Sequence, residues 1–134
     1  MAKILLVDDD ADLLSGQKAF LSKKGFTVET AGNIADGLAK AAQFAPDLVV
    51  ADLMMEHYDS GFVFCKKVRE LPGLSEVPIL MQTAAPRKIG FTFDTTTAKN
   101  RDWMKVDEVL TKPVPLEDLL GKVEQLLSRK GKNA

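Results

Sequence analysis

Ile4-Leu5-Leu6-Val7-Asp8-Asp9-Asp10 is the stretch that decides the fold, because a short apolar run passes directly into three carboxylates. A run of large apolar residues without polar alternation is typical of a strand buried on both faces, as in a parallel sheet covered by helices. The acidic residues then mark the end of this strand as a place where charged groups gather. The stretch therefore predicts an α/β fold with polar chemistry at a strand end.

Working outward from this stretch, strand and helix patterns alternate along the chain. Strand patterns cover residues 3–7, 26–30, 48–51, 77–82 and 109–111, and helical patterns cover residues 13–21, 34–42, 61–70 and 116–127. This alternation predicts a parallel sheet with helices on both faces. No helical stripe persists through residues 84–105, so no regular helix is predicted there.

Length and composition favour one domain of ordinary type. The chain has 134 residues, of which 46% are apolar and 28% charged, as in an average globular domain. We expect the domain to span residues 1–127, followed by a flexible basic tail at 128–134.

Charge and cysteine usage limit the partners and the compartment. The net charge of −1 provides no basic field, so neither DNA nor a membrane is expected as a partner. Cys65 is the single cysteine, which excludes an internal disulfide and favours a reducing compartment. Without a signal peptide or a long apolar segment, the chain is expected to be cytoplasmic, as a monomer or weak dimer.

Polar residues follow the strands at the ends where parallel α/β sheets bind their ligands. The first strand ends in Asp8 and Asp9, the third in Asp52, the fourth in Thr83 and the fifth in Lys112. If the first and third strands are neighbours, the carboxylates of Asp8, Asp9 and Asp52 converge on one small volume. Thr83 and Lys112 then line the adjacent edge of this site.

Clustered carboxylates repel one another unless some are protonated or a hard cation joins them. Magnesium suits an all-oxygen site and would help to bring an anionic phosphoryl group to an anionic nucleophile. Lys112 supplies a cation for a phosphoryl oxygen, and Thr83 supplies a hydroxyl donor. The set predicts a carboxylate nucleophile with a metal clamp and a charge-stabilising lysine. Asp10 is expected to cap the first helix instead.

With these residues in place, the chain resembles the response-regulator receiver family of two-component signalling, including its single-domain chemotaxis and sporulation regulators. The pieces that carry the resemblance are I-L-L-V-D-D-D (4–10), L-V-V-A-D-L-M-M (48–55), P-I-L-M-Q-T-A (78–84) and V-L-T-K-P (109–113). Each piece is weak alone, but the four in this order are highly specific. The resemblance implies a flavodoxin-like, doubly wound, five-stranded parallel sheet of strand order 2-1-3-4-5.

The resemblance also implies a role for individual residues. Asp52 looks like the phosphoacceptor. The implied ligands of Mg²⁺ (or Mn²⁺) are Asp8, Asp9, Asp52 and the backbone carbonyl of Met54. The implied phosphate-binding and switch residues are Thr83, Ala84 and Lys112, and the bond before Pro113 is expected to be cis.

The function that follows from the resemblance is a phosphoacceptor switch and not an enzyme. Family members take a phosphoryl group from a histidine kinase or a histidine phosphotransfer protein and signal to a protein partner by conformational change. Three departures stand out: Val109 occupies a position where the family often has an aromatic residue, Glu56 replaces the proline that is common after the phosphoacceptor strand, and the segment 85–105 is longer than usual. The sequence therefore does not predict that a partner protein binds at the face that this segment normally forms in the family.

Two other functions compete with this one. A phosphatase of the haloacid-dehalogenase type would use Asp8 as nucleophile and Asp10 as general acid. Its late acidic pair would have to be Asp107 and Glu108, which precede their strand instead of following it, and Asp52 would have no role. A docking module that is never phosphorylated would have no reason to keep the whole acidic, threonine and lysine set.

Overall fold

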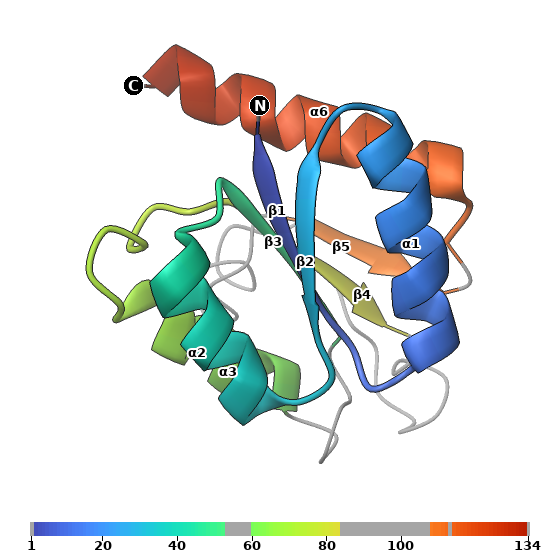
Figure 1. Ribbon diagram of the computed structural model, residues 1–134. Coiled ribbons are helices and arrows are strands. Elements are labelled where there is room, and N and C mark those ends of the chain that lie inside the picture. The colour runs from blue at the N-terminus through green and yellow to red at the C-terminus, as the bar shows by residue number, and fades with distance from the viewer. Residues whose placement is uncertain (1, 53–59, 84–107, 113, 134) are drawn as a thin grey trace.

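The computed structural model describes residues 2–52, 60–83, 108–112 and 114–133 (Figure 1). Five parallel strands form one sheet in the order β2-β1-β3-β4-β5, as the resemblance implies. The strands are β1 (Lys3–Val7), β2 (Thr27–Ala31), β3 (Leu48–Asp52), β4 (Ile79–Thr83) and β5 (Glu108–Thr111). Strands one and three are therefore neighbours, which is the condition for the acidic residues to meet.

Helices cover both faces of this sheet, as the alternating pattern predicts. The described helices are α1 (Ala11–Lys23), α2 (Ile34–Phe44), α3 (Ser60–Arg69) and α6 (Leu116–Asn133). Helices α1 and α6 lie on one face, and α2 and α3 lie on the other (Figure 1). Because α6 continues to Asn133, helical backbone extends into the segment expected to be a flexible tail; the domain boundary at residue 127 stays a prediction.

The apolar run of β1 is continuous because its two sets of side chains enter two different cores. Ile4 and Leu6 pack in the core under α1 and α6, while Leu5 and Val7 pack in the core under α2 and α3. All four side chains are at most 1% exposed. This burial on both sides is what distinguishes a central parallel strand from an amphipathic one.

Short polar side chains and glycine set the ends of the first two helices. Asp10 caps α1 as predicted, because its carboxylate accepts a hydrogen bond from the backbone N–H of Leu13 at 3.1 Å. Asn33 caps α2 in the same way. After α1 the chain turns at Gly25, whose φ of 100° is a left-handed conformation that glycine adopts without strain.

The strand boundaries at β4 differ from the predicted range of 77–82. The strand begins at Ile79 and ends at Thr83. The Arg69 guanidinium donates hydrogen bonds to the carbonyl oxygens of Ser75 and Val77, which holds the residues before the strand against α3. A pattern of strand residues does not reveal that an arginine six and eight positions earlier donates hydrogen bonds to the carbonyl groups before the strand.

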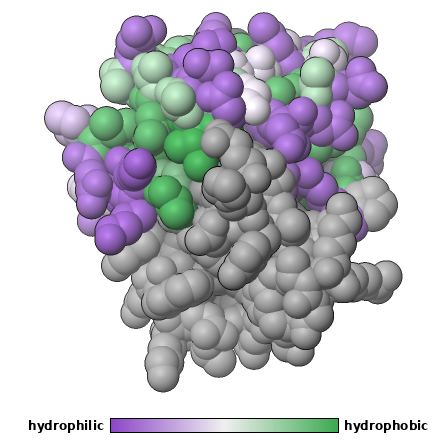
Figure 2. Space-filling model, turned by 90° about the horizontal axis from the view of Figure 1, so that it is seen from below, coloured by the Kyte–Doolittle hydropathy of each residue, from purple (hydrophilic) through white to green (hydrophobic). Residues whose placement is uncertain are grey.

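The carboxyl ends of the strands meet at the lower edge of the sheet in Figure 1. There the register places Val7 beside Ala51, Asp52 beside Gln82, and Thr83 beside Thr111. On the described part of the surface seen from this side, hydrophilic side chains border a hydrophobic area (Figure 2). The polar residues that follow the strands are thus gathered at one end of the molecule.

Candidate functional site: an acidic cluster at the carboxyl edge of the sheet

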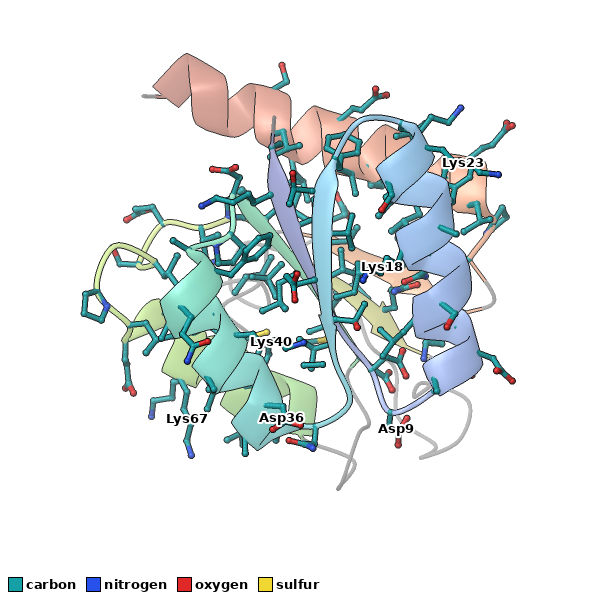
Figure 3. All side chains as sticks on the ribbon, viewed as in Figure 1. Asp9, Lys18, Lys23, Asp36, Lys40 and Lys67 are labelled. Atoms are coloured by element: carbon teal, nitrogen blue, oxygen red, sulfur yellow. The ribbon has the colours of Figure 1, made fainter. Side chains whose placement is uncertain are left out.

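Three carboxylates from two neighbouring strands meet at this edge. Asp8 and Asp9 follow β1, and Asp52 is the last residue of β3. One carboxylate oxygen of each residue lies within 4.8 Å of the others. Asp8 is 2% exposed and Asp52 is 5% exposed, whereas Asp9 is exposed at the lower edge in Figure 3. Two carboxylates of the cluster are therefore buried, and the third faces solvent.

Lys112 follows β5 and reaches back across the edge to this cluster. Its Nζ lies 2.8 Å from Oδ2 of Asp8 and 3.5 Å from Oδ1 of Asp52. Burial by itself lowers the pKa of Lys112, but the hydrogen bond to Asp8 and the charges of Asp52 and Asp8 outweigh it, and the pKa is raised above 10.5. The lysine is thus a permanent cation at neutral pH.

The carboxylate of Asp8 is held on both of its oxygens. Oδ1 accepts the backbone N–H of Asp10 at 2.9 Å, and Oδ2 accepts the ammonium of Lys112 at 2.8 Å. The backbone of Asp8 is fixed as well, because its N–H donates to the carbonyl of Ala31 on β2 at 3.1 Å. A carboxylate oriented in this way is better suited to hold a ligand in a fixed place than to move during a reaction.

The charge of the cluster fits a divalent hard cation. Three carboxylates and one ammonium leave two negative charges uncompensated among the described groups of the site. The donors are all oxygen atoms, which Mg²⁺ and Mn²⁺ prefer over nitrogen or sulfur. The residues present therefore match the expected metal in charge and in donor type.

Some predicted site residues are described only in part. Thr83 ends β4 as predicted, beside Thr111 of β5, and only its backbone is described. Met54, Ala84 and Pro113 lie outside the described residues. Their expected roles as metal ligand, phosphate contact and cis peptide stay predictions.

Next to the cluster lies a buried side-chain pair that the sequence patterns do not single out. Gln17 of α1 and Gln82 of β4 are 1% and 2% exposed, and their amides hydrogen-bond to each other. Gln17 lies within the helical pattern predicted over residues 13–21. A polar residue within an otherwise apolar stripe is a weak signal, and its partner lies 65 positions away in the sequence.

The comparison with protein families agrees with the site. The model of the response regulator receiver domain matches residues 4–124. The match covers nearly the whole sheet and its helices, including every acidic residue of the cluster and Lys112. The chain therefore belongs to the response regulator receiver domain family, in the two-component signalling class.

Curated relatives and solved structures place the chain in the same group. It is 33% identical over 129 residues to a DNA-binding dual master transcriptional regulator, RpaA, of Synechocystis, covering 96% of this chain and 50% of that protein. It is 32% identical to the alkaline phosphatase synthesis transcriptional regulatory protein PhoP of Bacillus subtilis, covering 95% of this chain and 49% of that protein. The chain thus spans about half the length of the curated relatives it matches.

Among solved structures, the Vibrio cholerae chemotaxis protein CheY4 superposes with a TM-score of 0.79 at 30% identity, covering 94% of this chain and 98% of that one. A receiver domain from Clostridium thermocellum superposes with a TM-score of 0.82 over the full length of both chains; at 24% identity, this likeness concerns the fold alone. Among the described helices, none combines the length and the apolar character that a membrane span requires.

The prediction that DNA is not a partner is contradicted by these relatives. Several of them are transcriptional regulators, and the Synechocystis protein is a DNA-binding one. The prediction relied on the net charge of −1. This was the error, because the charge of a receiver domain carries no information about how a regulator reaches DNA through another part of its chain.

Proposed function

We propose that this receiver domain is a magnesium-dependent phosphoacceptor switch that takes a phosphoryl group onto Asp52. The observation that carries the proposal is the meeting of Asp8, Asp9 and Asp52 within 4.8 Å, with the Lys112 ammonium 3.5 Å from Asp52. Membership of the receiver family supports it. A histidine kinase or histidine phosphotransfer protein is the expected phosphodonor.

In the proposed step, a carboxylate oxygen of Asp52 attacks the phosphorus of the donor. A bond forms between that oxygen and phosphorus, while the bond from phosphorus to the leaving group breaks and the leaving group departs with the electron pair. Mg²⁺ supplies, when bound, the positive charge that offsets repulsion between the phosphoryl group and the carboxylates. Asp8 and Asp9 would hold it together with Asp52.

Lys112 acts as a fixed counter-charge in this step. Its ammonium already lies between Asp8 and Asp52, so a phosphoryl oxygen on Asp52 would come within its reach without a large rearrangement. Ion pairing of lysine with phosphoryl oxygens is a strong, charge-assisted hydrogen bond. The same lysine would therefore bias the end of β5 toward the phosphoryl group, and Thr83 at the end of β4 would supply a hydroxyl to it.

The proposed conformational change follows from the attraction of Lys112 and Thr83 to the phosphoryl group. Phosphorylation is expected to change the populations of two conformations at the ends of β4 and β5, and this difference would be read by a partner. Residues 83 and 108–112 are the described positions at which the change should be visible. A stable phosphoryl mimic with Mg²⁺ that left the amide spectra of these residues unchanged would contradict this part of the proposal.

The test of the acceptor is intact mass after incubation with acetyl phosphate, with and without Mg²⁺. The wild type should gain one phosphoryl group only with Mg²⁺, Asp52→Asn should gain none, and Asp36→Asn should behave as wild type. Asp36 is a suitable control because it is exposed and lies at the same edge outside the cluster (Figure 3).

The same experiment distinguishes the competing functions. An adduct that survives in Asp52→Asn and is lost in Asp8→Asn would favour the phosphatase hypothesis, in which Asp8 is the nucleophile. The two occupied oxygens of Asp8 speak against that outcome. A wild-type chain that takes no phosphoryl group from acetyl phosphate or from a histidine phosphotransfer protein would favour a docking module.

A further inference from the structure

The side-chain amides of Gln17 and Gln82 hydrogen-bond to each other and so join α1 to β4. Nε2 of Gln17 donates to Oε1 of Gln82 at 2.9 Å, and Nε2 of Gln82 donates to Oε1 of Gln17 at 3.3 Å. Two antiparallel hydrogen bonds of this kind fix both the distance and the rotation of one side chain relative to the other. In the sheet, β3 lies between β1 and β4, so the hydrogen bonds join the helix that follows β1 to a strand that is not adjacent to β1.

The pair stands in an otherwise apolar core. Gln17 shares the buried face of α1 with Leu14 and Leu21, and Gln82 is two residues after Leu80 on β4. Buried amides lose their hydrogen bonds to water, so an apolar pair would fill the same space without that cost. The amides add what apolar side chains lack, which is a directional contact that allows one arrangement.

Both partners belong to elements that end or begin at the acidic site. Gln82 lies beside Asp52 in the register of β3 and β4 and directly precedes Thr83. Gln17 belongs to the helix whose N-terminal cap is Asp10, the residue that donates its N–H to Asp8. The pair thus connects the strand end that carries Thr83 with the helix that begins at the acidic residues.

We propose that Gln17 and Gln82 are positioning residues that hold the carboxyl end of β4, and with it Thr83, in place relative to Asp52. This inference rests on the proposed function, because Thr83 is the expected hydroxyl partner of the phosphoryl group. Neither glutamine touches the reacting atoms in this proposal. They act through the backbone of β4, by fixing where the strand end lies before the phosphoryl group arrives.

Three variants distinguish the effect of the amide hydrogen bonds from the effect of core packing. Gln17→Met alone leaves the Gln82 amide buried without its partner and should lower the urea midpoint of unfolding. Gln17→Met with Gln82→Met replaces both amides by unbranched side chains of similar volume and should recover most of that loss. Leu21→Met with Leu80→Met is the matched control, since it changes the same helix, strand and core without touching an amide.

The decisive measurement is the rate of phosphorylation by acetyl phosphate with Mg²⁺, followed by intact mass. We expect the double glutamine variant to be slowed by about five- to tenfold, because small displacements of a positioned group reduce rates strongly. The leucine control should stay within about twofold of wild type, as core swaps that conserve volume are well tolerated. A second measurement needs no variant that must fold: the side-chain NH₂ resonances of both glutamines in the wild type should shift when Mg²⁺ and beryllium fluoride are added.

The outcomes separate this inference from the proposed function. A double glutamine variant that is phosphorylated as fast as the leucine control would overturn the inference and leave the phosphoacceptor intact. NH₂ resonances that do not move with the phosphoryl mimic, in a wild type whose Asp52 is phosphorylated, would do the same. A wild type that takes no phosphoryl group would overturn the proposed function and this inference with it.

Discussion

Replacing Lys112 by methionine removes the cation between Asp8 and Asp52 while keeping most of the side-chain volume. The ammonium lies 2.8 Å from one carboxylate and 3.5 Å from the other. The substitution leaves two carboxylates that are 2% and 5% exposed without this counter-charge, beside the third acidic group of the cluster. We therefore expect a large loss of stability when no divalent metal is present.

The geometry gives the size of this loss. At an effective dielectric constant of about 20, attractions across these two distances amount to about 6 and about 5 kcal/mol before desolvation is subtracted. Removing one partner of a buried ion pair typically costs about 3–5 kcal/mol. The Lys112 side chain is 22% exposed, so water screens part of the attraction. We therefore expect Lys112→Met to lower the free energy of unfolding by about 2–4 kcal/mol.

The assay is urea unfolding at pH 7 in a metal chelator, with Lys122→Met as the control. Lys122 is 33% exposed and lies 3.6 Å from one carboxylate, that of Glu108, so its loss should cost below about 1 kcal/mol. Added Mg²⁺ should then stabilise Lys112→Met more than wild type, because the metal binds the folded site and replaces the missing charge. Equal losses in the two lysine variants, together with an equal effect of Mg²⁺ on both, would refute the reasoning.

Three further predictions concern single positions. Gly37→Ala should lower the melting temperature, with a cost of about 1–3 kcal/mol, because the new Cβ would lie 2.9 Å from the Phe64 ring; Gly121→Ala, which meets no atom within 4 Å, should be neutral or stabilising. Asp10→Ala should cost about 1 kcal/mol in urea unfolding by removing the cap of α1; an unchanged midpoint would contradict this. Since the pKa of Lys112 is raised when folded, the stability difference between wild type and Lys112→Met should be complete below pH 10.5 and disappear as pH rises through the higher folded pKa.

Much of the fold was predictable because each local signal is strong. The apolar run of β1, with both faces buried, leaves little choice but a central parallel strand. The rule that strand ends gather at one edge then predicts that Asp8 and Asp52 meet, and the register confirms that β1 and β3 are neighbours.

Contacts between distant side chains were not predictable in this way. Which carboxylates Lys112 would reach depends on the twist of the sheet and on the length of its side chain, and the sequence predicted only that it lines the edge. The Gln17–Gln82 pair is a stronger case, because a helical stripe and a strand pattern treat each glutamine as a separate polar exception. They come together only in the folded chain, where their side-chain amides hydrogen-bond to each other.

The error about DNA had a different origin. Net charge describes the long-range field of the chain that carries it, and here that chain spans half the length of the relatives with a transcriptional role. The lesson for receiver domains is that the charge of the switch does not predict the chemistry of the output.

The most direct test of the central claim identifies the residue that carries the phosphoryl group. The protein is treated with acetyl phosphate and Mg²⁺, reduced with borohydride, which converts an aspartyl phosphate to homoserine, and then digested for peptide mass spectrometry. A phosphoacceptor at Asp52 predicts homoserine at position 52 and at no other position. Homoserine at position 8, or none in a chain that carries the adduct, would contradict it.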